Sequence, residues 1–220
     1  MVTSLRGKVY QYIVFLLFSF LFALFFVPMA VFADEEIDNA SFEEWGNQIT
    51  SFGQGSIPED WSILSISSCC DPGPLIPSRV IHQSENAQDG DFSLRLGGDF
   101  FAGEDGAFLG VLMYQDIEIY GGEVFDFSYS AFGLNPFGSL AARAWVQWLD
   151  ENKNPIGVGL FNPLPSSGVG VYTLFSGTTT PAPCNAEFAR IRLDKASFGF
   201  AHFDNLIFEE NESIEEVECD

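Results

Sequence analysis

The segment Ala142-Arg143-Ala144-Trp145-Val146-Gln147-Trp148 decides the fold of this chain. Its even-numbered positions hold small or apolar residues, while Arg143, Trp145 and Gln147 hold the odd-numbered ones. A period of two places successive side chains on opposite faces of a β-strand. The Asp- and Asn-rich stretch 150–155 that follows predicts a turn. The segment therefore predicts a half-buried strand with Trp148 in the core and Trp145 on the outer face.

The same period recurs along the chain, and no segment after Ala33 has the 3.6-residue apolar period of a helix. Strands separated by Gly, Pro, Asn and Asp are predicted at 37–42, 61–67, 79–83, 92–96, 116–119, 125–130, 142–148, 171–175, 188–193 and 203–208. The acidic stretch 97–110 is predicted as a long loop. This spacing predicts an all-β fold, an antiparallel β-sandwich over residues 34–209, followed by an acidic tail at 210–220.

Several short motifs resemble, in the same order, those of the galactose-binding-like jelly rolls, the fold of many carbohydrate-binding modules. Asn39-Ala40-Ser41-Phe42-Glu43 is similar to their N-G-x-F-E opening, and Asp89–Leu94 and Phe203–Leu206 are similar to later landmarks. The resemblance covers nearly all of the chain after residue 33 and implies a jelly-roll β-sandwich. The adjacent pair Cys69-Cys70 and Cys184 depart from the family pattern.

The resemblance also implies a structural calcium ion. In these jelly rolls the first and last strands lie close together, so Glu43 and Asp204 would share one Ca²⁺, with backbone carbonyls near Ser41 and Asp91 as further ligands. Calcium suits such a site because it accepts about 6–8 oxygen ligands in flexible geometry. The alternative is that Glu43 caps a turn and Asp204 is only solvated.

The N-terminus has the order of an export signal. Arg6 and Lys8 precede the apolar run 13–27, and the small-residue exit Val31-Phe32-Ala33 leads into acidic residues. Residues 1–33 are therefore predicted to be a signal peptide, which makes the protein secreted, extracellular or cell-surface, with no stable membrane insertion after cleavage. The alternative is an uncleaved anchor, because residues 13–32 are long enough to span a bilayer.

The charge of the chain excludes some partners. The 31 Asp and Glu residues exceed the 9 Lys and Arg residues, for a net charge of −22, and removal of residues 1–33 would leave 7 − 31 = −24. Nucleic acids and anionic membrane surfaces both require a basic face, so neither is an expected partner. A hydrophobic content of 47% is too high for intrinsic disorder.

Export gives the four cysteines an oxidising compartment, where they can pair in three ways. A disulfide between adjacent cysteines such as Cys69 and Cys70 is rare, because the small ring that it closes is strained. We expect one of them to pair with Cys184 and the other with Cys219. A zinc site is not favoured, because the chain has no C-x-x-C motif and its two histidines lie far apart in sequence.

One sheet face carries the candidate ligand residues. Arg143, Trp145 and Gln147 are the outward-facing positions of one predicted strand. Arg190 and Arg192 are outward-facing positions of another. Sugar recognition uses an aromatic face with hydrogen-bonding groups beside it, so these five residues predict a site for a glycan or cell-surface polysaccharide, including an acidic one. The alternative is that the arginines pair with acids and Trp145 packs under a loop, in an extracellular structural or adhesion protein without sugar binding.

Catalysis is not predicted. Acids are so abundant that no pair of carboxylates can be singled out for glycoside hydrolysis. Neither His82 nor His202 lies near a G-x-S-x-G motif, and the glycine pairs lack the lysine of a phosphate-binding loop. The sequence therefore favours a non-catalytic binding protein.

Overall fold

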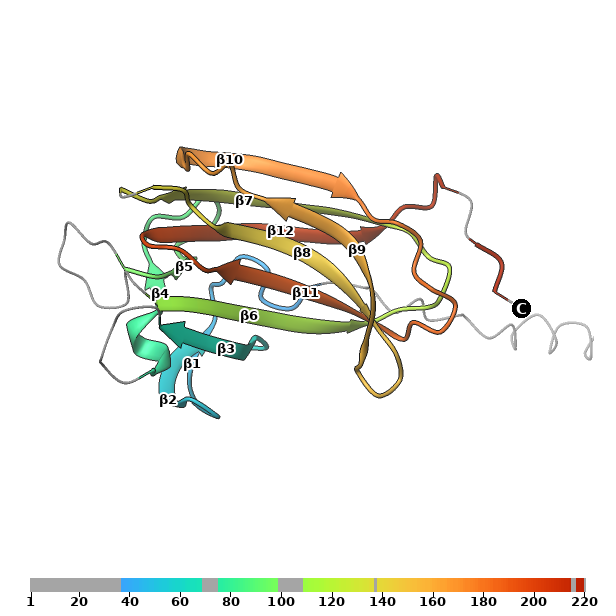
Figure 1. Cartoon of the computed structure of the whole chain (residues 1–220), viewed down its shortest axis with the longest axis horizontal. Coiled ribbons are helices and arrows are strands. Elements are labelled where there is room, and N and C mark those ends of the chain that lie inside the picture. Colours follow the sequence, from blue (N-terminus) through green and yellow to red (C-terminus); the bar gives the residue numbers. More distant parts are fainter. Residues whose placement is uncertain (1–36, 69–74, 99–108, 137, 215–216, 220) are drawn as a thin grey trace, which may run out of the picture. The chain divides into compact units, whose positions relative to one another are not determined.

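The computed structural model of the chain describes residues 37–68, 75–98, 109–136, 138–214 and 217–219 (Figure 1). The chain divides into two units, Met1–Asp34 and Glu35–Asp220, and all described residues belong to the second. The predicted signal peptide, residues 1–33, lies outside the described residues. Within those residues, no helix is both long and apolar enough to cross a membrane.

Twelve strands and one short 3₁₀ helix make up the described part of the chain, and all strand pairs are antiparallel. One sheet has the order β10-β7-β12-β5-β4, the other has the order β3-β6-β11-β8-β9, and β1 and β2 form a separate hairpin. The elements are β1 (Trp45–Thr50), β2 (Gly53–Pro58), β3 (Ser62–Ser68), η1 (Pro77–Arg79), β4 (Ile81–Ser84), β5 (Ser93–Leu96), β6 (Leu109–Glu118), β7 (Phe125–Leu134), β8 (Ala142–Leu149), β9 (Pro155–Pro163), β10 (Val169–Thr178), β11 (Phe188–Lys195) and β12 (Phe200–Glu210). The predicted antiparallel jelly-roll sandwich is confirmed.

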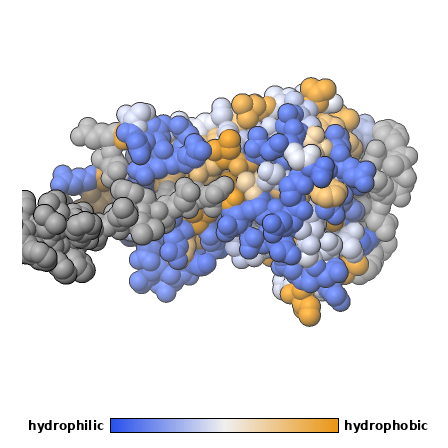
Figure 2. All heavy atoms as spheres, turned by 180° about the vertical axis from the view of Figure 1, so that it is seen from behind, coloured by the Kyte–Doolittle hydropathy of each residue, from blue (hydrophilic) through white to orange (hydrophobic). Residues whose placement is uncertain are grey.

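The hydrophobic core is built from the alternating positions of both sheets. In β8 the alternate residues Ala144, Val146 and Trp148 are buried, as the period-two pattern predicted. Phe125 of β7 contributes from the opposite sheet and packs with its ring centroid 6.0 Å from that of Trp148. The far side of the molecule shows mainly hydrophilic residues, with hydrophobic ones exposed in a strip between them (Figure 2).

The two ends of the sandwich are neighbours. The Leu206 amide in β12 donates a hydrogen bond to the carbonyl of Ala40 at 3.2 Å. Phe42 and Phe203 are both fully buried in the same core. The opening motif and the closing strand therefore lie side by side, as the resemblance implied.

The predicted strand at 37–42 and the end of the predicted loop at 97–110 were wrong, and three strands, β1, β2 and β9, were missed. Residues 37–42 form turns, because the Phe42 amide binds the Asn39 carbonyl and the Asn39 side chain binds the Glu44 amide. The β1–β2 hairpin was missed because its strands are polar and rich in glycine, and part of β6 was assigned to the loop 97–110. β9 was missed because its glycines break the apolar alternation. Gly159 is required there, since a Cβ at this position would lie 2.5 Å from the Trp148 ring.

The predicted cysteine pairing was also wrong, because Cys184 bonds to Cys219 with a Cα–Cα distance of 5.3 Å. Cys184 lies against Gly121, just beyond the C-terminal end of β6. The strand that leads to Cys69 and Cys70 ends at Ser68, which pairs with Leu109 at the other end of β6. Cys69 and Cys70 themselves lie outside the described residues. The disulfide attaches the predicted acidic tail to the sandwich. A hydrogen bond from the Val217 amide to the Gly122 carbonyl, at 3.2 Å, is a second attachment.

Candidate functional site

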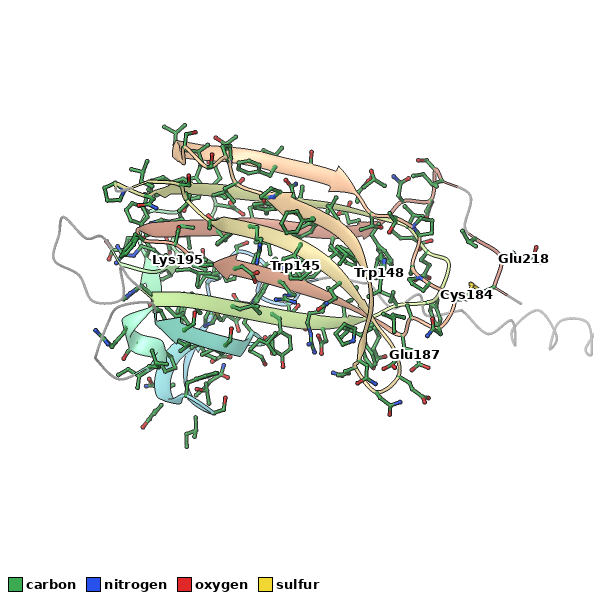
Figure 3. All side chains as sticks on the ribbon, in the orientation of Figure 1. Trp145, Trp148, Cys184, Glu187, Lys195 and Glu218 are labelled. Carbon is green, nitrogen blue, oxygen red and sulfur yellow. A yellow bond between two sulfur atoms is a disulfide. The ribbon has the colours of Figure 1, made fainter. Side chains whose placement is uncertain are left out.

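All five predicted ligand residues lie on the outer face of the sheet that contains β8 and β11. Trp145 is the cross-strand partner of Arg192, and Gln147 is the partner of Arg190. Arg143 shares the parity of Trp145 in β8, opposite Asp194. We call this surface the β8–β11 face. Trp145 and Trp148, three residues apart on β8, lie on opposite faces of the sheet (Figure 3).

Trp145 and Arg192 form a stacked pair at the centre of the β8–β11 face. The guanidinium carbon of Arg192 lies 3.8 Å from the centroid of the Trp145 ring, which is a cation–π distance. Arg192 Nη1 donates a hydrogen bond to Gln147 Oε1 at 3.1 Å, so the guanidinium is fixed in two directions. Trp145 is half-buried. One side of its indole is therefore covered by Arg192 and does not present a bare platform.

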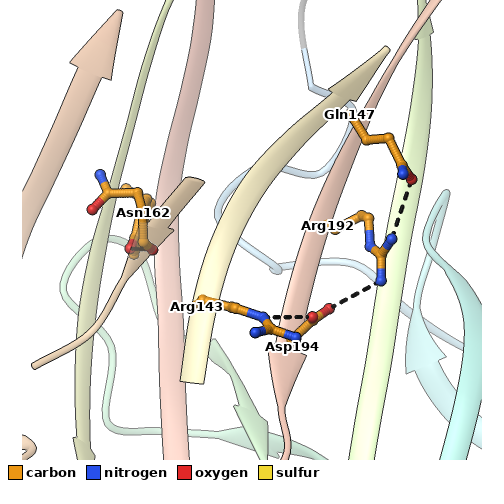
Figure 4. Close-up of polar contacts among 6 residues, drawn as sticks. Arg143, Gln147, Asn162, Arg192 and Asp194 are labelled. Carbon is orange, nitrogen blue, oxygen red and sulfur yellow. Dashed lines mark hydrogen bonds and ion pairs between the residues drawn. The ribbon is translucent and has the colours of Figure 1, made fainter. Parts of the chain in front are cut away.

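Arg143 lies beside the Trp145–Arg192 pair, where it contacts Asp194 and the Trp145 and Phe161 rings (Figure 4). Its Nε donates to Asp194 Oδ2 at 2.9 Å, and its guanidinium carbon lies 5.8 Å from the Trp145 ring and 5.4 Å from the Phe161 ring. The Arg143 side chain is 40% exposed, and Phe161 on the neighbouring edge strand β9 is 51% exposed. The outer part of the β8–β11 face thus combines an exposed aromatic ring with an oriented guanidinium.

Arg190 belongs to the face but is not exposed, contrary to the prediction. Its Nε and Nη2 donate to the two carboxylate oxygens of Asp116 at 2.6 and 2.9 Å, and its guanidinium carbon lies 4.2 Å from the Tyr114 ring. Lys153 adds a second cation 3.1 Å from Asp116. Burial alone would raise the pKa of Asp116, but the hydrogen bonds and charges of Arg190 and Lys153 outweigh it, so this pKa is lowered. Arg190 therefore joins β11 to β6.

Two residues of the face were missed by the sequence analysis. Asp194 continues the outward parity of Arg190 and Arg192, so the period-two pattern could have found it. Phe161 had no such signal, because the glycines of β9 break the alternation. The cluster also contains Trp145 Nε1 and Arg192 Nε, which are buried without a hydrogen-bond partner among the described residues, while Asp194 Oδ1 has Arg192 Nη2 as its ion-pair partner at 3.9 Å. The core residues Trp61 and Trp148 leave Nε1 without a partner in the same way, so these atoms do not by themselves mark a ligand site.

The predicted calcium ligands gather around one loop. Glu43 Oε1 accepts hydrogen bonds from the amides of Asp91 and Phe92, both at 3.0 Å. Asp204 Oδ2 accepts from the amides of Gln88 and Asp89 at 2.6 and 3.0 Å. Glu43 thus caps a turn, while Asp204 is fully buried and not merely solvated. Burial raises the pKa of Asp204 against the lowering effect of these amides.

Glu43 and Asp204 bring carboxylate oxygens, the atom type that calcium prefers, to this loop. Glu43 Oε2 makes no hydrogen bond to any described residue and faces the loop that Asp204 also binds. A Cβ at Gly90 would overlap Glu43, so this glycine is needed for the close approach. Ser41 lies two residues before Glu43. The described residues contain no group of three or more His, Cys, Asp or Glu side chains around one point, so main-chain oxygens would have to supply much of the coordination.

Ser93 and His202 do not form an accessible nucleophile–base pair. Ser93 Oγ lies 3.2 Å from His202 Nδ1, but this hydroxyl donates its hydrogen to the Asn86 carbonyl at 2.8 Å. Ser93 is fully buried, so a substrate cannot reach it. Burial, followed by the charges of Arg95 and His82, lowers the pKa of His202 to about 3. The pair holds the loop before β5 against β12.

The fold and the face together define a jelly-roll sandwich with a polar and aromatic outer surface. No family model matches the chain, and a search of curated proteins found no match. Among solved structures, the enzymatically active domain of bacteriophage CBA120 tailspike protein 4 is similar, with a TM-score of 0.55, 16% identity and 81% of this chain covered. The chain spans 22% of that tailspike chain.

Carbohydrate-binding modules are also among the similar structures. TmCBM61 in complex with β-1,4-galactotriose has a TM-score of 0.47 and 10% identity, over 80% of this chain and 97% of that one. The xylan-binding domain from CBM 22 has a TM-score of 0.46 and 12% identity, over 80% and 99%. At these identities the likeness is one of fold.

Proposed function

We propose that this protein is a secreted, non-catalytic glycan-binding protein that uses the β8–β11 face. The observation that supports this most strongly is the exposed Phe161 ring beside the guanidinium of Arg143, which Asp194 orients and which is itself 40% exposed. Glycan hydroxyl groups donate and accept hydrogen bonds, and sugar C–H groups pack on aromatic rings. A sugar bound beside Trp145 would pack its ring on the exposed Phe161 and accept hydrogen bonds from the 40% exposed Arg143.

The test is the loss of glycan binding in Trp145→Ala. A glycan array probed with the wild-type protein should give at least one ligand, and isothermal titration with that ligand should show an affinity reduced about tenfold or more in the variant, as expected when a binding-site aromatic is removed. Tyr120→Ala is the matched control, because Tyr120 is 72% exposed outside the β8–β11 face, and it should bind like the wild type. Equal affinity of the wild type and Trp145→Ala would contradict the proposal.

A second candidate is an extracellular structural or adhesion protein that binds no sugar. The observation in its favour is that Arg190 and Arg143 each have an acidic partner and that Arg192 covers one side of Trp145. This protein would bind no glycan on the array at millimolar concentration. Its Trp145→Ala variant would change stability alone.

We propose further that Glu43 and Asp204 hold a structural calcium ion, with Ser41 and Asp91 contributing main-chain oxygens. The support is that both carboxylates bind the loop 88–92 and that their oxygens are hard donors. A ligand present at 100 times its Kd stabilises a fold by about 2.7 kcal/mol, which is roughly 5–10 °C for a domain of this size.

Removal of calcium should therefore lower the melting temperature. We expect EGTA to reduce the Tm by about 5–10 °C and added Ca²⁺ to restore it, whereas Mg²⁺ should restore less because it requires stricter geometry. The Asp204→Asn variant should lose the EGTA response, and its exposed counterpart Asp126→Asn should keep it. An EGTA-insensitive melt of a metal-free protein would remove the site.

A further inference from the structure

The charge of the β8–β11 face differs from that of the rest of the chain. Strands β6, β8 and β11 and the turn 150–154 hold five of the nine basic residues, namely Arg143, Lys153, Arg190, Arg192 and Lys195. They hold five of the 31 acids, namely Asp116, Glu118, Asp150, Glu151 and Asp194. These segments therefore have a formal charge of 5 − 5 = 0 in a chain of net charge −22. Local fields of this kind determine which charged ligands a surface accepts.

Among the arginines of this face, Arg143 is the one available to a ligand, while Lys153, although 51% exposed, forms an ion pair with Asp116 at 3.1 Å. Arg190 is buried and bidentate to Asp116, and the Arg192 side chain is only 12% exposed against Trp145. Arg143 is 40% exposed and uses Nε for its hydrogen bond to Asp194. Its Nη1 and Nη2 make no hydrogen bond to any residue that the structure describes. Two parallel donors at the end of a guanidinium match the two oxygens of a carboxylate.

The guanidinium is also held in place before a ligand arrives. Asp194 fixes Nε at 2.9 Å, while the Trp145 and Phe161 rings lie 5.8 and 5.4 Å from the guanidinium carbon. Asp194 is itself fixed by burial, with a side chain 5% exposed. A donor pair that is already oriented loses little conformational entropy on binding. Phe161, half-exposed beside it, offers the apolar surface on which a pyranose ring packs.

We infer that the β8–β11 face binds an anionic glycan, a polysaccharide containing uronic acid, with a sugar carboxylate accepting hydrogen bonds from Nη1 and Nη2 of Arg143 and the sugar ring packed on Phe161. This inference rests on the proposed glycan-binding function and specifies its ligand class. The contact acts at short range, because charges more than about 8 Å apart are largely screened at physiological salt. The acidic residues elsewhere in the chain therefore do not prevent it.

The test compares glycans that share a backbone and differ in charge. The probes are polygalacturonate against its methyl ester, and glucuronoxylan against unsubstituted xylan, measured by affinity electrophoresis and titration calorimetry with the full chain. In at least one pair the anionic member should bind about tenfold or more tightly, which corresponds to 1.4 kcal/mol. Raising the salt concentration should weaken that binding and leave neutral binding unchanged.

Arg143 variants locate the charge contact. Arg143→Gln should lose the preference for the anionic member, and Arg143→Lys should retain part of it, because lysine keeps the charge and loses the paired donors. Melting curves of both variants should match the wild type within a few degrees. Equal or better binding of the neutral members would overturn the inference and leave the proposed function standing. An absence of binding to all four probes would overturn the inference, and the proposed function would fall with it only if the glycan array also gave no ligand.

Discussion

The Asp116→Asn variant should be less stable than the wild type by about 3 kcal/mol at neutral pH. Asp116 and Arg190 are buried partners, with side chains 9% and 11% exposed. Replacement by asparagine keeps the shape but leaves the Arg190 guanidinium without its counter-charge, and breaking a buried ion pair in this way costs about 3–5 kcal/mol. We take the lower end because Lys153 can turn to solvent, its side chain being 51% exposed. Urea denaturation at pH 7 measures the difference.

The same difference should depend on pH in a defined direction. The pKa of Asp116 is lowered in the folded protein, so the unfolded chain binds its proton more readily. The contribution of the carboxylate is therefore fully present above the unfolded pKa of about 3.9 and is lost as the pH falls through the lowered pKa. The gap between the wild type and Asp116→Asn should be full at pH 6 and shrink towards pH 2. Asp38→Asn, at an exposed position whose carboxylate makes no hydrogen bond to any described residue, should remain within about 0.5 kcal/mol of the wild type; a comparable loss there would contradict the assignment.

The second large effect is expected from the disulfide. Cys184→Ser should destabilise the fold by about 3–4 kcal/mol, because the bond closes a loop with a sequence separation of 35 and its removal restores entropy to the unfolded chain. Residues 217–219 should also become accessible to proteases, because the disulfide and the Val217–Gly122 hydrogen bond attach them to the sandwich. Chemical denaturation and limited proteolysis measure the two effects.

Double variants separate the disulfide from the side chains themselves. Cys219→Ser should match Cys184→Ser, and the double variant should cost no more than either one, because each change removes the same bond. A reducing agent should destabilise the wild type by the same amount and act weakly on the double variant. If Cys69→Ser produced this loss instead, the Cys184–Cys219 pairing would be wrong.

Much of the fold could be predicted from the sequence because burial on one face imposes alternation. β8 and β11 were found from the alternation of apolar with polar residues, and the apolar positions of that pattern, such as Val146 and Ile191, are fully buried. β1, β2 and β9 escaped because edge and hairpin strands bury too little to need alternation. The disulfide escaped for another reason: which loops meet at one end of a sandwich depends on topology, and sequence spacing does not reveal it.

The candidate site was predictable to the level of a shared face but not of side-chain availability. Parity placed Arg143, Trp145, Gln147, Arg190 and Arg192 together, and the register confirms that placement. Parity could not show that Arg190 is buried by Asp116, which comes from β6, a strand more than 70 residues earlier. For the same reason it could not show that Arg192 covers Trp145 or that Phe161 lies beside Arg143.

The central claim, that glycan binds on the β8–β11 face, is tested most directly by following the four tryptophan indole N–H signals in a ¹⁵N-labelled sample. Trp145 reports on the face, whereas Trp61 and Trp148 are each 1% exposed in the core. During titration with a glycan that binds, the Trp145 signal should shift in proportion to saturation while the Trp61 and Trp148 signals stay in place. Saturation with an unmoved Trp145 signal, accompanied by shifts in β5, β7 or β12, would place the ligand on the other sheet and contradict the account.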